Sequence, residues 1–197
     1  MTGALSAKLV ESCHQPAVTH HQLAKILFEL YKNKSFRQIP IRLAKALPTR
    51  SDLSRACNGL LNNGVLSNPS GFPPGVFRYM PQPLKSVEGI ICSADAFAYV
   101  SHLSAMEFHG LTNRLPMTMF VTTLPPVGWK LQAKVQMHAA LGNDWEAFAA
   151  SNLLQMTRPK IEKVERKQIH TVTSTIAGAY INVRGSAMRV SSLGRTF

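Results

Sequence analysis

The sequence predicts an α+β protein whose first half contains three helices and a hairpin, and whose second half mixes helices with strands. In the first half, apolar residues recur at helical spacing between residues 20 and 62, and a turn-rich segment with short β-branched runs follows them. In residues 86–197, helical stretches come first and extended stretches dominate afterwards. That order is typical of a mixed α+β domain.

Composition favours a polyanionic partner. The chain of 197 residues carries a net charge of +12, and 45% hydrophobic residues are enough to bury a core. No apolar run approaches the roughly 20 residues of a membrane-spanning helix. The first residues are too short and too broken for a signal peptide. We therefore expect a cytoplasmic protein that binds nucleic acid and not a membrane.

The positive charge is concentrated in the first half. Residues 1–85 contain 11 Lys and Arg residues against three acidic residues, a net charge of +8, whereas the remainder carries +4. Pro81-Gln-Pro83 disfavours helix and predicts a linker. We expect an arm or a short helix of low stability over 1–18, a DNA-binding domain over 19–82, and a second domain over 86–197.

Two helices are predicted before residue 48. The first spans 20–32, and its apolar stripe follows i, i+3, i+4, i+7 spacing. The stripe consists of Leu23, Ile26, Leu27, Leu30 and Tyr31. A short second helix is predicted over 41–47, because Pro40 suits a first helical position and Pro48 ends the pattern.

A third helix is predicted over 49–64. Thr49 or Ser51 can cap its N-terminus, Asp52 suits the positive end of the helix dipole, and Gly64 ends it. Its apolar side chains gather on one side, and the opposite side carries Ser51, Ser54, Arg55, Asn58 and Asn62. Such side chains contact phosphates and base edges in the major groove.

A hairpin follows the third helix. Residues 65–66 and 76–79 predict two short strands, and 68–75 contain the Gly and Pro residues of a turn-rich tip. Three helices followed by a hairpin predict a winged helix-turn-helix. Residues 64–77 contain no Lys or Arg, so wing contacts would come from backbone, Ser67 and Asn68, or from Arg78 at the base.

The second half is expected to begin with helix over 93–108, in one or two segments, with Gly110 as a stop. The other elements expected there are strands over 116–123 and 135–140, a helix over 145–156, extended segments over 161–164 and 168–172, a hairpin over 179–190, and a strand over 190–196 running into a helix. This last pattern led us to expect a fragment of a longer protein, incomplete at its C-terminus.

No pattern favours an enzyme. His102 and His109 share a helical face, but Glu107 lies well around the helix from them, and their spacing is not that of a zinc-protease helix. Phosphate-binding glycine loops and paired carboxylates are missing from the sequence. The cysteines, Cys13, Cys57 and Cys92, lack metal-ligand spacing and are expected to be reduced thiols. We expect no cofactor, no metal and no catalytic residue.

Two segments of the second half resemble the AbiE-type abortive-infection antitoxins. They are Ser101 to Thr112, with the strand after it, and Arg189-Val-Ser-Ser-Leu-Gly-Arg195-Thr196. The first half adds the pattern that ends in Gly75-Val-Phe-Arg-Tyr79. Together these motifs extend the resemblance over most of the chain.

The resemblance implies an N-terminal winged helix that binds operator DNA and represses its own operon. It also implies a C-terminal antitoxin domain that neutralises a nucleotidyltransferase-like toxin, with or without a stable complex. In the family the wing is often basic, and more sequence follows the terminal motif. Catalytic residues are not implied.

The function expected is that of a sequence-specific regulator bound to double-stranded operator DNA, an inverted repeat, with the oligomeric state left open. The expected DNA-binding residues are Arg37, Arg42, Lys45, Thr49, Arg50, Ser51, Ser54, Arg55, Asn58 and Arg78. Two alternatives remain. In the first, the polar helix face meets only water and the chain is a module that binds and neutralises an acidic protein. In the second, it is an enzyme acting on nucleic acid.

Overall fold

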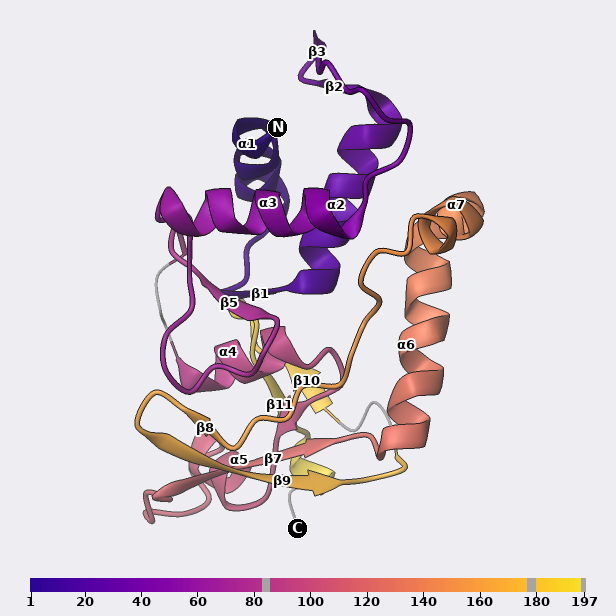
Figure 1. Cartoon of the computed structure of the whole chain (residues 1–197). Helices are drawn as coiled ribbons and strands as arrows, with labels where there is room; N and C mark the ends of the chain where they lie inside the picture. Colours follow the sequence, from indigo (N-terminus) through magenta and orange to yellow (C-terminus); the bar gives the residue numbers. More distant parts are fainter. Residues whose placement is uncertain (83–85, 177–179, 196–197) are drawn as a thin grey trace.

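The computed structural model describes residues 1–82, 86–176 and 180–195, and the chain is a mixed α+β protein (Figure 1). Helices α1 to α3 gather at one end of the molecule and the larger sheet lies at the other, with α4 between them. Pro83 of the expected linker, Ala179 of the expected hairpin and Thr196 lie outside the described residues. Among the described helices, none combines the length and the apolar character needed to cross a bilayer.

The N-terminal unit alternates helices with the strands of a small antiparallel sheet of order β1-β5-β4. In chain order its elements are α1 (Thr2–Ser12), β1 (Ala17–Thr19), α2 (His20–Asn33), α3 (Arg50–Asn62), β4 (Leu66–Ser67) and β5 (Val76–Tyr79). The three helices pack on one another. Both long helices expected in this unit are confirmed, as is the hairpin after the third.

The starts of α2 and α3 are fixed by reciprocal capping. Thr19 accepts a hydrogen bond from the Gln22 N–H and donates its own N–H to the Gln22 side chain, and Thr49 does the same with Asp52. A capping box satisfies two backbone donors that a helix start leaves unpaired. The structure therefore selects Thr49, of the two expected candidates, as the cap of α3.

The helix expected over 41–47 is wrong. A two-stranded hairpin, β2 (Ser35–Phe36) and β3 (Ile39–Pro40), fills the start of the connection between α2 and α3, and residues 41–47 form neither helix nor strand. Leu43 and Leu47 pack against the core instead. These partly buried apolar side chains anchor the irregular connection on the core.

Residues 1–18 are not a loose arm. Helix α1 buries Leu5 and Leu9 against α2 and α3, and β1 pairs with β5 from Ala17 to Thr19. A short helix was one of the two forms expected for this segment, but its place in the core was not, because two fully buried apolar positions are too few for a clear period. The unit thus contains a helix and a strand before α2.

Helix α4 (Val87–Ala94) lies between the two sheets. Ile90, Ile91 and Ala94 form one buried cluster with Val76 of β5 and Val121 of the larger sheet, among others. Residues 95–100, which were expected to continue this helix, instead form a turn and strand β6 (Tyr99–Val100). The small sheet, α4 and the large sheet therefore share apolar contacts, and α4 joins the two halves of the chain.

The larger sheet is mixed and has the order β10-β11-β6-β7-β9-β8. Its further strands are β7 (Thr118–Thr123), β8 (Lys163–Val164), β9 (Lys167–Thr173), β10 (Tyr180–Asn182) and β11 (Arg189–Ser191). Strands β7 and β9 run parallel over their length, and β10 and β11 form the expected hairpin. Helix α5 (His102–Phe108) packs beside β7 and β11, where Ala105 joins Val100 and Val190 in a small buried cluster.

The strand expected over 135–140 is wrong. Those residues belong to α6 (Pro126–Leu141), which buries Trp129, Ala133, Met137 and Leu141 at i, i+4 spacing. Exposed apolar residues on another side of α6 blurred the helical period. Helix α7 (Trp145–Ala150) then follows a single 3₁₀ turn, Gly142–Asp144, and ends six residues earlier than expected.

The C-terminal segment is held by Arg189. Its guanidinium donates to the carbonyls of Ala98, Cys92 and Asp95 at 2.6–2.8 Å. The Asp95 carboxylate accepts from Trp129 Nε1 at 2.8 Å and from Thr123 Oγ1 at 2.7 Å. These buried polar bonds join β11, the end of α4, β7 and α6. A second 3₁₀ turn, Leu193–Arg195, follows β11 in place of a longer helix within the described residues.

Truncation of Leu9 tests whether α1 belongs to the core. Leu9 is 1% exposed, so Leu9→Ala should lower the free energy of unfolding by about 2–5 kcal/mol through lost burial and a cavity. Val10, which is 53% exposed on the same helix, is the matched control, and Val10→Ala should change stability by less than about 0.5 kcal/mol. Urea unfolding measures both. Equal, small losses for the two variants would mean that α1 is the dispensable arm.

Candidate nucleic-acid interface

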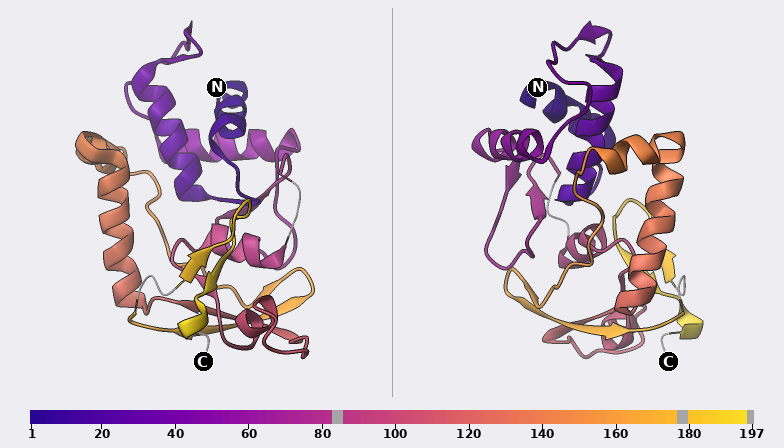
Figure 2. Two further views of the ribbon diagram at one scale, coloured as in Figure 1. Left: turned by 180° about the vertical axis from the view of Figure 1, so that it is seen from behind. Right: turned by 45° about the vertical axis from the view of Figure 1, so that its right-hand side comes forward.

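Helix α3 presents a polar face to solvent. Leu53, Ala56, Cys57 and Leu60 are buried on its inner side. Its exposed side chains are Arg50, Ser51, Ser54, Arg55, Asn58 and Asn62. In Figure 1 α3 crosses in front of α1 and α2, and in the reversed view of Figure 2 it lies behind them, so its outer face is at the surface of the molecule. All the side chains that the sequence assigned to this face are accessible to a ligand.

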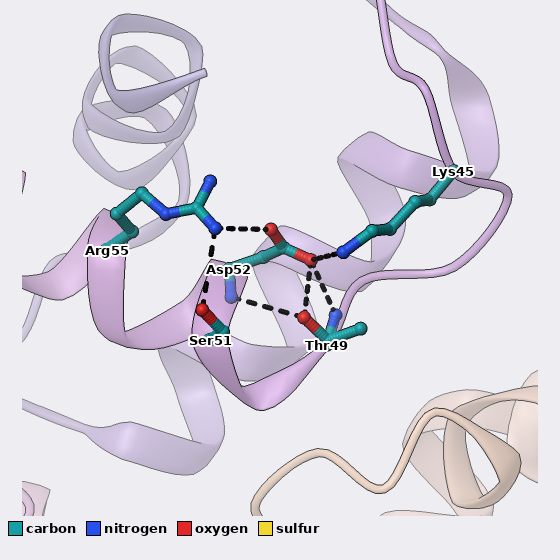
Figure 3. Close-up of polar contacts among 5 residues, drawn as sticks. All are labelled: Lys45, Thr49, Ser51, Asp52 and Arg55. Carbon is teal, nitrogen blue, oxygen red and sulfur yellow. Dashed lines mark hydrogen bonds and ion pairs between the residues drawn. The ribbon is translucent and has the colours of Figure 1, made fainter.

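Asp52 organises the cationic groups beside this face (Figure 3). Its carboxylate accepts from Thr49 Oγ1 at 2.6 Å and lies 3.5 Å from both Lys45 Nζ and an Arg55 guanidinium nitrogen. Arg55 also donates to Ser51 Oγ at 3.4 Å. Asp52 itself is only 9% exposed, whereas Lys45 and Arg55 are mostly exposed. The cationic groups of Lys45 and Arg55 therefore face solvent, and the Asp52 carboxylate lies beneath them.

Arg50 is held by the C-terminal half. It donates to the backbone carbonyl of Asn152 at 2.8 Å and to the side-chain oxygen of the same residue at 3.2 Å. Asn152 lies just after α7 in a left-handed conformation, with φ of 53°. Sequence reasoning missed Asn152 because no local pattern connects two residues so far apart in the chain. The contact engages two nitrogens of the exposed Arg50 guanidinium and so restrains its position.

Two further residues predicted for the site, Arg37 and Arg42, lie in the connection before α3 and are exposed. Arg37, at the tip of the β2–β3 hairpin, lies 2.6 Å from Glu11 and 5.3 Å from the centre of the Phe36 ring. Arg42 is exposed, and no hydrogen bond or ion pair joins it to the described residues. Both therefore lie outside the Asp52 cluster and would extend a positive surface away from α3.

The wing expected between β4 and β5 turns toward the C-terminal half. A Cβ atom at Gly71 would lie 3.4 Å from the Lys163 carbonyl oxygen, and Phe72 packs against the cluster around α4. Arg78 alternates with Phe77 and Tyr79 along β5, which both belong to the core under α3. Its side chain thus lies on the opposite face of the small sheet, where its buried Nε has no hydrogen-bond partner among the described residues.

The two histidines of the Ser101 to Thr112 segment contact oxygen atoms of neighbouring residues. His109 contacts the Ser191 carbonyl at 2.7 Å, and His102 contacts Ser101 Oγ at 2.9 Å, without a carboxylate on either ring. Residues 1–82, 86–176 and 180–195 contain no group of three His, Cys, Asp or Glu side chains positioned for a metal. The three thiols are buried, and burial raises the pKa of Cys57 to about 11.

The Asp52 network predicts a stability loss in acid. The Thr49 hydroxyl lowers the pKa of the Asp52 carboxyl; burial opposes this effect, and Lys45 and Arg55 add to it. A depressed folded-state pKa stabilises the fold above the unfolded value, about 3.9, and this stabilisation is lost as pH falls through the folded pKa. Asp52→Asn should therefore lower stability by about 1 kcal/mol at pH 7 and by less at pH 3.

Glu146→Gln is the control for that experiment, since Glu146 is an exposed carboxylate in the first turn of α7. Denaturant unfolding of the three proteins between pH 3 and pH 7 gives the comparison. If the free energies of unfolding of the wild type and of Asp52→Asn change with pH in parallel, the charged Asp52 carboxylate does not stabilise the fold.

Comparisons with known proteins leave the family open. A scan against protein-family models finds no match, and a search of curated proteins finds none either. The geometry of α3 and its surroundings is therefore the basis for a functional proposal.

Proposed function

We propose that the protein is a transcriptional regulator that binds double-stranded DNA through α3. The observation that carries the proposal is the exposed Ser, Arg and Asn face of that helix, beside Lys45 and Arg42, in the half of the chain with a net charge of +8. Such side chains bond phosphates and base edges, and a helix fits the major groove.

The element order of the N-terminal unit supports this proposal. Helix, strand, two helices and two strands follow one another, and the first strand pairs with the last. We interpret this as a winged helix-turn-helix in which α2 and α3 are the two helices of the motif and α3 is the recognition helix. The connection between them is long, because it contains the β2–β3 hairpin.

Distinct roles follow for the exposed residues. Arg55, Ser54 and Asn58 lie along the middle of α3 and would meet base edges. Phosphates would be held by residues at the helix start and in the connection before it, namely Arg37, Arg42, Lys45, Thr49, Arg50 and Ser51. Arg78 has no such role in our proposal, and the docked wing leaves α3 as the main reader of the groove.

The resemblance of the terminal motif and the Ser101 segment to AbiE-type antitoxins suggests the biological setting. We propose that the protein represses the operon that encodes it and opposes a nucleotidyltransferase-like toxin. Two copies on an inverted repeat would place their α3 helices about one helical turn of DNA apart. This setting rests on the resemblance, whereas the DNA-binding surface rests on α3.

A second candidate function is binding of an acidic protein. Val127, Leu131 and Val135 are 84%, 62% and 56% exposed and form one stripe along α6. Lys130 and Lys134 lie next to the stripe, and the helix contains no acidic residue. Charge complementarity favours an acidic amphipathic helix over a second copy of α6. Loss of a partner on Leu131→Asp, but not on Gln132→Asp, would distinguish this surface from α3.

DNA binding predicts a steep salt dependence. We assume that about four phosphates are neutralised, by Arg37, Arg42, Lys45 and Arg50. A plot of the logarithm of the DNA association constant against the logarithm of the salt concentration should then have a slope of about −3.6. Arg55→Ala should cost about 1–3 kcal/mol on promoter DNA and much less on a scrambled duplex. Fluorescence anisotropy at several salt concentrations measures both quantities.

Arg166→Ala is the control, because Arg166 is an exposed cation on the turn between β8 and β9, at the far end of the molecule (Figure 1). It should leave affinity nearly unchanged. If Arg55→Ala and Arg166→Ala weaken both duplexes to the same extent, the protein binds DNA only by its overall charge and α3 is not a reader of sequence.

A further inference from the structure

A cavity of about 450 Å³ opens between the N-terminal unit and the second half of the chain. Its walls come from the first turns of α2, the end of α4, the inner side of α6, and residues 154–159 after α7. Figure 1 shows α6 rising beside α4 and β1, with the segment after α7 running down between them. The volume lies within the usual range for small-molecule sites, about 300–1,000 Å³.

The larger part of the cavity's lining surface is apolar. Trp129, Met137 and Met156 supply large surfaces, and small residues such as Ala94 and Ala140 leave the space open. Trp129 is held in place because its Nε1–H donates to the buried Asp95 carboxylate at 2.8 Å. A fixed indole and two adaptable thioethers suit a ring or a short hydrocarbon chain.

The charge at the rim has one sign. Lys25 is the single charged side chain among the described lining residues, and no ion pair engages it within the described part of the chain. His20 and His21 also line the rim, but burial lowers the pKa of each ring, so both are neutral near pH 7. The Gln22 side chain is already bonded to the cap of α2 and to Gln15.

We propose that this cavity binds a small apolar monocarboxylate. The hydrocarbon part packs against Trp129, Met137 and Met156, and the carboxylate pairs with Lys25 at the rim. A cation of the same shape meets Lys25 as a like charge, and a neutral alcohol gains the apolar contacts without the ion pair. The ligand class thus follows from an apolar interior with one unpaired cation at its opening.

The cavity is also placed to affect α3, and this part of the inference rests on the proposed DNA-binding function. His20 donates its backbone N–H to the Gly75 carbonyl at 2.8 Å, next to β5, and the His21 ring contacts the Leu154 carbonyl at 3.1 Å. Leu154 lies two residues after Asn152, which holds Arg50 of α3. An occupied cavity therefore biases the position of Asn152 and the freedom of Arg50 to bind DNA.

Isothermal titration of the whole chain at pH 7.4 with decanoate, decanol and decylammonium tests the site. Decanoate should bind at least about tenfold more tightly than the other two, a difference of about 1.4 kcal/mol. Lys25→Gln should remove this preference, leaving decanoate and decanol alike. Ala140→Phe, which fills the cavity, should weaken all binding by about tenfold or more.

Ala139→Phe is the matched control, since Ala139 is the neighbouring exposed alanine of α6 and does not line the cavity. It should bind decanoate as the wild type does. Thermal unfolding of each variant shows whether it is folded. Equal binding of decylammonium and decanoate, or unchanged decanoate binding by folded Ala140→Phe, would overturn the proposal.

Adding decanoate to the promoter-binding assay separates the two proposals. If decanoate binds with the expected effects of the variants but the protein does not bind promoter DNA, the ligand site is supported and the proposed regulatory function is wrong. If the protein binds promoter DNA but titration detects no decanoate binding, the proposed ligand site is wrong and the proposed regulatory function stands. A shift in DNA affinity on addition of decanoate, abolished by Ala140→Phe, supports both the site and its link to α3.

Discussion

The packing of α2 between two groups of helices is the constraint on which the rest of the structure depends. One side of α2 faces α1 and α3, and Phe28 contacts Phe148 of α7 at a ring-centre distance of 5.3 Å. Lys32 adds an ion pair with Asp144 at 2.6 Å. Because the same apolar cluster contains residues from α1 to Leu153, the N-terminal unit and the end of α6 form one core.

This shared core decides how α3 is presented. The wing is turned toward β8 and β9, Arg50 is bonded to Asn152, and α4 is packed between the two sheets. A free winged helix can use both its recognition helix and its wing on DNA. Here the segment between β4 and β5 lies against the second half of the chain, so our proposal assigns recognition to α3, and Asn152 is a direct contact between the second half and that helix.

The sequence predicted the helices and strands correctly where interactions between residues close in the chain determine the structure. Helix α2 was predicted from its apolar period, and α3 from its period and its cap candidates, of which Thr49 forms a capping box. The exposed Arg55 face followed from the same helical geometry. Strand β7 was predicted from its β-branched and alternating content, and β9 covers the segment that was expected to be extended over 168–172.

The predictions from the sequence were wrong where contacts between distant parts of the chain determine the structure. Residues 41–47 have a helical pattern but pack in irregular form, and α6 has apolar side chains on two sides, which hid its period. The placement of Arg78 away from α3, and of Asn152 against Arg50, depends on how sheets and helices pack, and no local spacing encodes it. The sequence predicted an α3 interface, and only the fold showed what restrains it.

Position-specific cross-linking tests the central claim most directly. A single photoreactive group attached at Asn58→Cys on α3, or at Ser70→Cys on the wing, reports which element reaches promoter DNA. The native thiols are buried, so the introduced cysteine is the reactive one. The account predicts efficient cross-links from position 58 and few from position 70. Cross-links from the wing and none from α3 would contradict it.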